Sequence, residues 1–118
     1  MPHTAMLPNH EAAVIPHAKL AGYALDPEHE VGRHKARVFA AVLGMTREHA
    51  MLLEQAIRAG LAHHPAVPKH ADKHGQRYEV DLPVTGPTGS AIVRMGWIVR
   101  EEDGAPWLTS AYVKESPR

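Results

Sequence analysis

The sequence predicts an α+β domain in which about three N-terminal helices pack on a C-terminal antiparallel meander of three to four strands. In the first half of the chain, apolar residues recur at helical spacing between glycine and proline stops, and after Gly75 the spacing changes to two. The chain has 118 residues, of which 44% are hydrophobic and 22% charged, as is typical of one globular domain with a modest core. We therefore expect a single domain over residues 1–118.

The N-terminal part is expected to begin loosely and then form a helix. Residues 1–9 are predicted to be a loose lead-in, and Val14–Ile15 a short extended segment. Pro16 suits the first turn of a helix that runs to about Leu25, and Asp26-Pro27 stops it.

Two further helices are predicted between glycine stops. One runs from about Gly32 to Leu43 and ends at Gly44. The next has Thr46 as its N-cap, runs to Ala59 and ends at Gly60. Its inward stripe is formed by Ala50, Leu53 and Ile57.

The segment 61–75, LAHHPAVPKHADKHG, has no sustained period and is rich in histidine and lysine. We predict a long loop there, with at most a short extended piece at Ala66–Val67. Loops of this length in compact domains tend to be functional or disordered.

Three strands are predicted after this loop. Residues 77–84 alternate, and the turn signal TGPTG at Thr85–Gly89 separates them from a long strand at Ser90–Arg100. That strand is apolar on both faces, so we place it at the centre of the sheet, followed by a last strand at Trp107–Lys114. The inward face of the first strand is formed by Tyr78, Val80, Leu82 and Val84.

Composition excludes several classes of protein. The absence of cysteine rules out disulfides and thiolate metal sites. No apolar run approaches the roughly 20 residues of a membrane span, and the first residues do not resemble a signal peptide. No P-loop, G-x-G-x-x-G or G-x-S-x-G motif is present.

The net charge is zero but unevenly distributed. Residues 31–77 hold eight basic and three acidic residues, a net charge of +5, and six of the ten histidines. This middle segment could meet a polyanion, or it could be an ordinary solvated face.

The predicted second helix presents a histidine and a lysine close to its apolar stripe. Counted at 100° per residue, Lys35 lies inside that stripe and His34 on its flank. Either the lysine stem covers apolar surface while its ammonium reaches water, or both groups line a cleft. The stripe consists of Val31, Val38 and Val42, with Phe39 at its edge.

The central strand contributes Arg94 and Trp97. Arg94 faces away from Trp97, and we expect it to pair with Glu79 or Asp81 across the hairpin; its functional alternative is phosphate binding. A tryptophan on a central strand is usually part of the core. Thr109 is predicted on the last strand, on the same face as Trp107, Ala111 and Val113.

Other candidate contacts lie in the turns. Thr85 and Thr88 of the TGPTG turn could touch an anion, and Lys69 and Lys73 of the loop could contact phosphates. A weaker alternative is a metal site at His70 and His74, whose spacing of four suits a metal on a helix.

Several segments together resemble a bacterial domain of unknown function that occurs alone, at the C-terminal ends of polymorphic and contact-dependent toxins, and in phage head proteins. The layout is also similar to the barnase/EndoU/colicin/RelE superfamily of ribonuclease toxins. The segments are LPN (7–9), YALDPEH (23–29), GRHKARVFAAVLG (32–44), YEVDLPVTGPTG (78–89), VRMGWIV (93–99) and LTSAYV (108–113).

The resemblance implies roles for individual residues. His34 and Lys35 match in kind the helix pair of colicin-type tRNA nucleases, although they are adjacent here rather than three apart. Met95-Gly96-Trp97 resembles a Ser-Gly-Trp strand, with methionine replacing the hydroxyl residue. Either Thr109 supplies that hydroxyl, or activity is weak or absent.

The function implied is metal-independent, cofactor-free cleavage of RNA by 2′-OH attack, giving a 2′,3′-cyclic phosphate. In this candidate endoribonuclease, His34 is the general acid/base, Lys35 the transition-state cation and Thr109 the group that orients the phosphate. Arg94 is a second phosphate ligand if its face borders the cleft, and Trp97 shapes the site.

Two alternatives stay open: a non-catalytic protein- or RNA-binding module derived from a toxin domain, and a histidine-rich metal-binding domain. The expected partners are RNA, with tRNA as a candidate, and a cognate immunity protein. We expect the protein to act in the cytoplasm, either of its own cell or, as a secreted effector, of a target cell.

Overall fold

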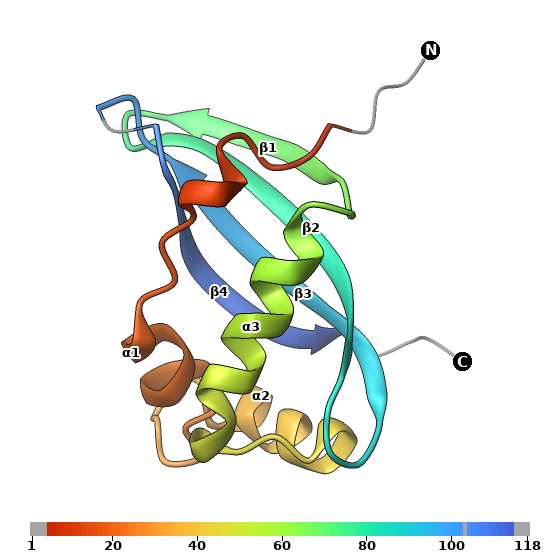
Figure 1. Ribbon diagram of the computed structural model, residues 1–118. Helices are drawn as coiled ribbons and strands as arrows, with labels where there is room; N and C mark the ends of the chain where they lie inside the picture. The colour runs from red at the N-terminus through yellow and green to blue at the C-terminus, as the bar shows by residue number, and fades with distance from the viewer. Residues whose placement is uncertain (1–4, 103, 115–118) are drawn as a thin grey trace.

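The computed structural model describes residues 5–102 and 104–114, and it confirms the predicted α+β fold, with helices first and an antiparallel sheet after them (Figure 1). The helical segments are His10–Ala12, α1 (His17–Lys19), a π-turn at Leu20–Ala24, α2 (Arg33–Val38), a π-turn at Phe39–Leu43, a 3₁₀ turn at Arg47–His49 and α3 (Ala50–Leu61). The strands are β1 (Ala66–Asp72), β2 (Gly75–Thr85), β3 (Ser90–Val99) and β4 (Pro106–Lys114).

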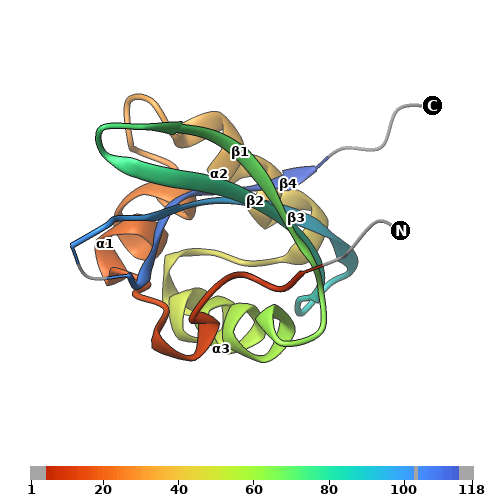
Figure 2. The ribbon, with the colours of Figure 1, turned by 90° about the horizontal axis from the view of Figure 1, so that it is seen from above.

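The four strands form one antiparallel sheet in the order β1-β2-β3-β4, so β3 is central as predicted. Figure 2 shows α3 packed along one face of this sheet, while the opposite face is not covered by it. We call these the packed face and the open face.

The core lies between the packed face and the helices. The predicted alternation of β2 is confirmed, because Val80, Leu82 and Val84 are buried while Glu79 and Asp81 point to the open face. The other residues that the sheet contributes to this core are Ala66, Val93, Met95, Trp97, Leu108, Ala111 and Val113. The predicted stripe of α3 is also buried, at Ala50, Leu53 and Ile57.

The third helix begins and ends close to the predicted residues. Thr46 is the N-cap of the 3₁₀ turn that leads into α3, and its backbone N–H donates a hydrogen bond of 2.9 Å to Nδ1 of His49. The helix continues through Gly60 to Leu61, so Gly60 is not the stop that we expected. A Cβ atom at Gly60 would lie 2.8 Å from the side chain of Leu82, so this glycine lets the helix approach the sheet closely.

The prediction of a loop over residues 61–75 is wrong for most of that segment. Residues 66–72 form β1, an edge strand paired with β2 from Ala66↔Val80 to Asp72↔Gly75. After Ala66 every side chain of β1 is exposed, so no apolar alternation marks the strand in the sequence. Pro68 is tolerated because an edge strand leaves one side of its backbone unpaired.

The prediction of a loose lead-in is also wrong where the structure describes it. Residues 1–4 lie outside the described residues, but Leu7 is only 1% exposed and belongs to the core. The carbonyl of Ala5 accepts a hydrogen bond of 2.9 Å from the backbone of Ala66. The segment therefore holds the start of β1.

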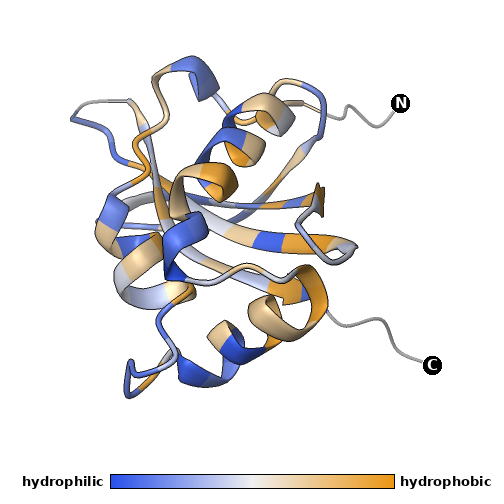
Figure 3. Cartoon of the chain, turned by 60° about the horizontal axis from the view of Figure 1, so that its bottom comes forward, coloured by the Kyte–Doolittle hydropathy of each residue, from blue (hydrophilic) through white to orange (hydrophobic). Residues whose placement is uncertain are grey.

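The apolar stripe predicted for the second helix is rotated by about one residue, or ~100°. Val31 is 71% exposed and Val42 38% exposed. The buried positions are Gly32, Ala36, Phe39 and Leu43. The buried side of the helix begins with the small residues Gly32 and Ala36, so an apolar stripe counted from Val31 did not identify it. Figure 3 shows that the helix is hydrophilic at its start and hydrophobic at its end.

No helix among the described residues is both long enough and apolar enough to cross a bilayer.

Candidate functional site

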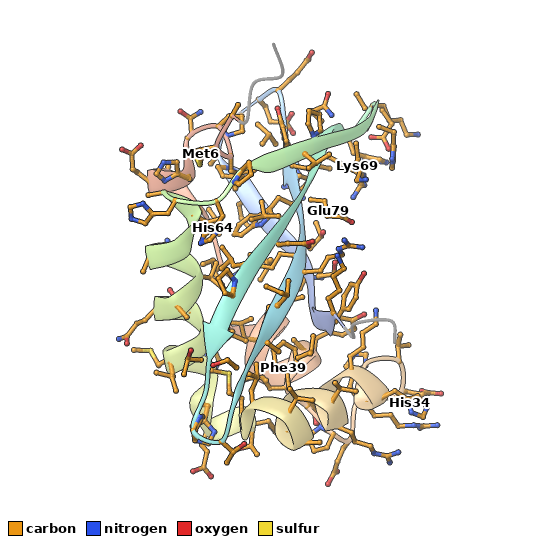
Figure 4. All side chains as sticks on the ribbon, turned by 90° about the vertical axis from the view of Figure 1, so that its right-hand side faces the viewer. Met6, His34, Phe39, His64, Lys69 and Glu79 are labelled. Carbon is orange, nitrogen blue, oxygen red and sulfur yellow. The ribbon has the colours of Figure 1, made fainter. Side chains whose placement is uncertain are left out.

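The candidate site is the open face of the sheet, together with α2 at its lower end. Figure 4 shows Glu79 and Lys69 on the side of the sheet away from α3, and His34 on the same side at the far end of the molecule. The strand registers place Asp81 beside Arg94, and Arg94 beside Tyr112, across the middle of this face. The face therefore carries charged side chains where the packed face carries apolar ones.

Arg94 is the centre of an ion-pair network, and its predicted pairing across the hairpin is confirmed. Its Nε and Nη2 donate hydrogen bonds of 2.9 and 3.0 Å to the two carboxylate oxygens of Asp81. Glu79 lies 3.6 Å from Arg94, and Lys114 lies 3.4 Å from Asp81. These hydrogen bonds, which Arg94 donates and Asp81 accepts, hold the pKa of Asp81 below its usual value and raise the pKa of Arg94.

Below this network, α2 and β4 form a corner that contains His34 and Lys35. The ammonium of Lys35 lies 4.7 Å from the centre of the Tyr112 ring, a cation–π contact. Both residues are exposed, and the buried side of the helix lies elsewhere, at Ala36 and Phe39. The corner is a shallow hollow of about 270 Å³, lined by His34, Lys35, Val38, Tyr112 and Val113.

Above the network lies a second hollow, of about 280 Å³, whose floor is Gly96. The pairing of β3 with β4 shifts between Gly96 and Trp97, which leaves Thr109 as an extra residue in β4. A Cβ atom at Gly96 would lie 2.9 Å from the hydroxyl oxygen of Thr109 and 2.9 Å from that of Ser110. The prediction that Thr109 shares a face with Ala111 is therefore wrong, because the bulge brings its hydroxyl to Gly96 on the open face.

Cations border the hollow over Gly96. Lys69 lies 3.7 Å from Glu79, and Arg77 lies 3.8 Å from Asp72. His70 also lines this hollow. Of the residues predicted from sequence, the structure brings Lys69 and Thr109 together here, and Trp97 also lines the hollow although its side chain is buried. The corner of α2 holds His34 and Lys35.

Trp97 and Met95 point to the packed face. Trp97 is 1% exposed, as predicted for a core residue, and its buried Nε1 has no hydrogen-bond partner among the described residues. Met95 is fully buried. A hydroxyl at position 95 would therefore not reach a phosphate on the open face, and the hydroxyls on that face come from Thr109 and Ser110 instead.

The remaining candidates lie away from both hollows. Thr85 and Ser90 share a hydrogen bond at the closed end of the β2–β3 hairpin, with 2.9 Å between their hydroxyl oxygens. The backbone N–H of Thr88 donates to the carbonyl of Leu43, so this turn serves to hold the end of the helix. Lys73 borders a larger hollow of about 540 Å³ between two hairpin tips. The negative charges of Glu101 and Glu102, which also line it, would repel an anion.

The alternative metal site has little support in the geometry. His74 lies in the β1–β2 turn, where its backbone N–H donates a hydrogen bond of 2.8 Å to Asp72 and lowers the pKa of that carboxyl. His70 lies 3.6 Å from Asp72. Within residues 5–102 and 104–114, no group of three histidine or carboxylate side chains could hold a metal ion.

Sequence reasoning missed two residues of the open face, Ser110 and Tyr112. The alternation of β2 placed Glu79 opposite its apolar positions, as the structure shows. Ser110 and Tyr112 depend on the bulge in β4 and on the packing of α2, which no local pattern signals.

The family profile described as "Domain of unknown function (DUF6883)" matches residues 6–115. The chain belongs to this family. No curated protein matches the sequence. Among solved structures, the DUF6883 domain is similar to a chain of a contact-dependent growth inhibition toxin–immunity protein complex from Klebsiella pneumoniae 342. That match has a TM-score of 0.58 and 21% identity, and it covers 86% of this chain and 99% of the other. It shows a shared fold.

Proposed function

We propose that this DUF6883 domain has a toxin-related role and cleaves RNA without a metal ion at the corner between α2 and β4. The observation that carries the proposal is that His34, Lys35 and Tyr112 border one hollow at the end of a sheet face whose centre is Arg94. The shared fold with a chain of a toxin–immunity complex supports the toxin-related part.

The corner offers the groups that such a reaction needs. A neutral His34 imidazole accepts the proton of the 2′-hydroxyl as the 2′-oxygen bonds to phosphorus. The bond from phosphorus to the 5′-oxygen breaks, water protonates that oxygen, and the products are a 2′,3′-cyclic phosphate and a free 5′-hydroxyl. Lys35 stabilises the charge on the pentavalent phosphorus, and Tyr112 positions the Lys35 ammonium.

The test is cleavage of total cellular RNA in excess EDTA, read on a denaturing gel. We expect discrete fragments from the native protein and a loss of about 100-fold or more in rate for His34→Ala. His63→Ala is the matched control, because His63 is an exposed histidine that follows α3. Circular dichroism of each variant establishes that the fold is intact.

One observation favours a second candidate, a non-catalytic binding module. Glu79 and Asp81 already engage Arg94, so two carboxylates compete with any phosphate for the central cation. In that case the partner would be a protein, of which a cognate immunity protein is the form that the toxin-related fold suggests. Intact RNA with a folded native protein would favour this module and overturn the nuclease.

A further inference from the structure

The hollow over Gly96 has the construction of a small polar binding site. Its floor is a glycine at a position where any side chain would collide with two hydroxyl groups, those of Thr109 and Ser110. The bulge in β4 is what brings two consecutive hydroxyl side chains to this one point. Hydroxyl groups can donate hydrogen bonds to anionic oxygens.

Cationic side chains surround those hydroxyls. Lys69 and Arg77 line the hollow from two different strands, and His70 lies beside them. The two cations that line the hollow are each paired with one carboxylate, Lys69 with Glu79 at 3.7 Å and Arg77 with Asp72 at 3.8 Å. Such partly exposed pairs are weak, so an oxyanion that replaced the carboxylates would meet two cations and the Thr109 hydroxyl.

We propose that the hollow over Gly96 is a second phosphate subsite, which holds a backbone phosphate of a nucleic-acid strand that runs on across the open face towards the corner of α2. The identity of the strand rests on the proposed function, whereas the phosphate chemistry rests on the hollow itself.

The spacing of the two sites fits this assignment. Ser110 pairs with Gly96 in the hollow, and Tyr112 pairs with Arg94 beside the corner. Two residues along a β-strand span about 7 Å, which is comparable to the separation of neighbouring phosphates in an extended single strand. One such step leads from the hollow to Arg94 and Tyr112, and Lys35 of the corner contacts the Tyr112 ring.

Glu79 then acts as a restraint on anion binding. Its carboxylate holds Lys69 and Arg94 and adds a negative charge at the rim of the hollow. Its replacement by glutamine would release Lys69, leave Arg94 held by Asp81 alone, and remove that charge. The subsite therefore predicts that Glu79→Gln binds phosphate more tightly than the native protein, which a merely structural role for Glu79 would not predict.

The first experiment titrates the ¹⁵N-labelled protein with inorganic phosphate and follows the amide signals. We expect the largest shifts at Gly96, Thr109 and Ser110, with little change at Thr85 at the far end of the hairpin. Shifts confined to other parts of the molecule, or no saturable shift at all, would overturn the proposal.

The second experiment measures the anisotropy of a short labelled 2′-deoxy oligonucleotide, which 2′-OH attack cannot cleave. Thr109→Val should weaken binding about tenfold, because it removes one hydroxyl donor to a charged group. Thr85→Val is the matched control and should bind as the native protein does, whereas Glu79→Gln should bind more tightly. Equal binding by Thr109→Val and the native protein would overturn the subsite.

The two proposals can fail separately. Binding that depends on Thr109, in a protein that leaves RNA intact, would retain the subsite and reject the nuclease. Cleavage of RNA that depends on His34, with oligonucleotide binding indifferent to Thr109 and Glu79, would retain the nuclease and reject the subsite.

Discussion

At the scale of single residues, the open face is organised by the pairing of Arg94 with Asp81. The two hydrogen bonds join opposite charges on neighbouring strands, so they fix the arginine across the middle of the sheet. This pairing could be predicted from the sequence, because the hairpin turn sets the register and the alternation sets the face. The face of the sheet on which Thr109 lies could not be predicted, because it depends on one extra residue in β4. No residue type in the sequence indicates this bulge.

The Asp81 carboxyl makes a pH-dependent contribution to stability. Since its folded-state pKa lies below the ordinary value of 3.8, the contribution is present above about pH 4 and is lost as the pH falls through the folded-state pKa. Asp81→Asn should lower the free energy of unfolding by up to about 1 kcal/mol at neutral pH, because the pair is partly exposed to solvent. The difference should vanish in acid. Urea unfolding of both proteins at several pH values measures this, and equal stability at neutral pH would contradict it.

At the scale of elements, the turn between β2 and β3 docks on the C-terminal end of the helical segment that carries His34 and Lys35. The backbone of Thr88 donates to Leu43, and Gly44 adopts a left-handed conformation beside it, with φ of 69°. Sequence patterns identified the helix, its glycine stop and the hairpin separately. Their contact joins residues 43 and 88, which are far apart in the sequence, so a pattern of neighbouring residues could not predict it. The edge strand β1 could not be predicted either, because it is defined by backbone pairing with β2 and not by an apolar alternation.

Gly86 is expected to be intolerant of substitution because of this contact. A Cβ atom there would lie 2.3 Å from the carbonyl oxygen of Leu43, a backbone atom that cannot move cheaply. Gly86→Ala should lower the free energy of unfolding by about 1–3 kcal/mol. Gly22→Ala is the control: its new methyl group would meet only Ala18, at 3.9 Å, so that variant should be neutral or slightly stabilising. Thermal unfolding measures both, and similar melting temperatures for the two variants would count against the close contact.

At the scale of the whole molecule, the N-terminal segment connects the two edges of the sheet. The carbonyl of Ala5 bonds the start of β1, and Val14 exchanges backbone hydrogen bonds with Pro106 and Leu108 on β4. Between these points, Leu7 is buried in the core. The sequence predicted the extended piece at Val14–Ile15 but not this connection. Leu7 stands among prolines and polar residues, so no periodic pattern indicated that it is buried.

Leu7→Ala should therefore destabilise the whole domain. Removal of a fully buried leucine side chain costs about 2–5 kcal/mol, although the residue lies near the end of the chain. Leu52→Ala is the matched control, because Leu52 is 42% exposed on α3, and it should cost less than about 0.5 kcal/mol. Chemical denaturation compares the two, and equal effects would show that the N-terminal segment does not contribute to the core.

The docking of the β2–β3 turn on the helix end has a practical consequence for protein engineering. Tight hairpin tips are usually the safest places for a peptide tag, a new pair of chain ends or an inserted reporter domain. Here the tip at residues 86–89 is a poor choice, since an insertion would displace the helix that bears His34 and Lys35. The tip at Lys73–His74 is the better one, because its side chains are exposed and it ends the edge strand β1.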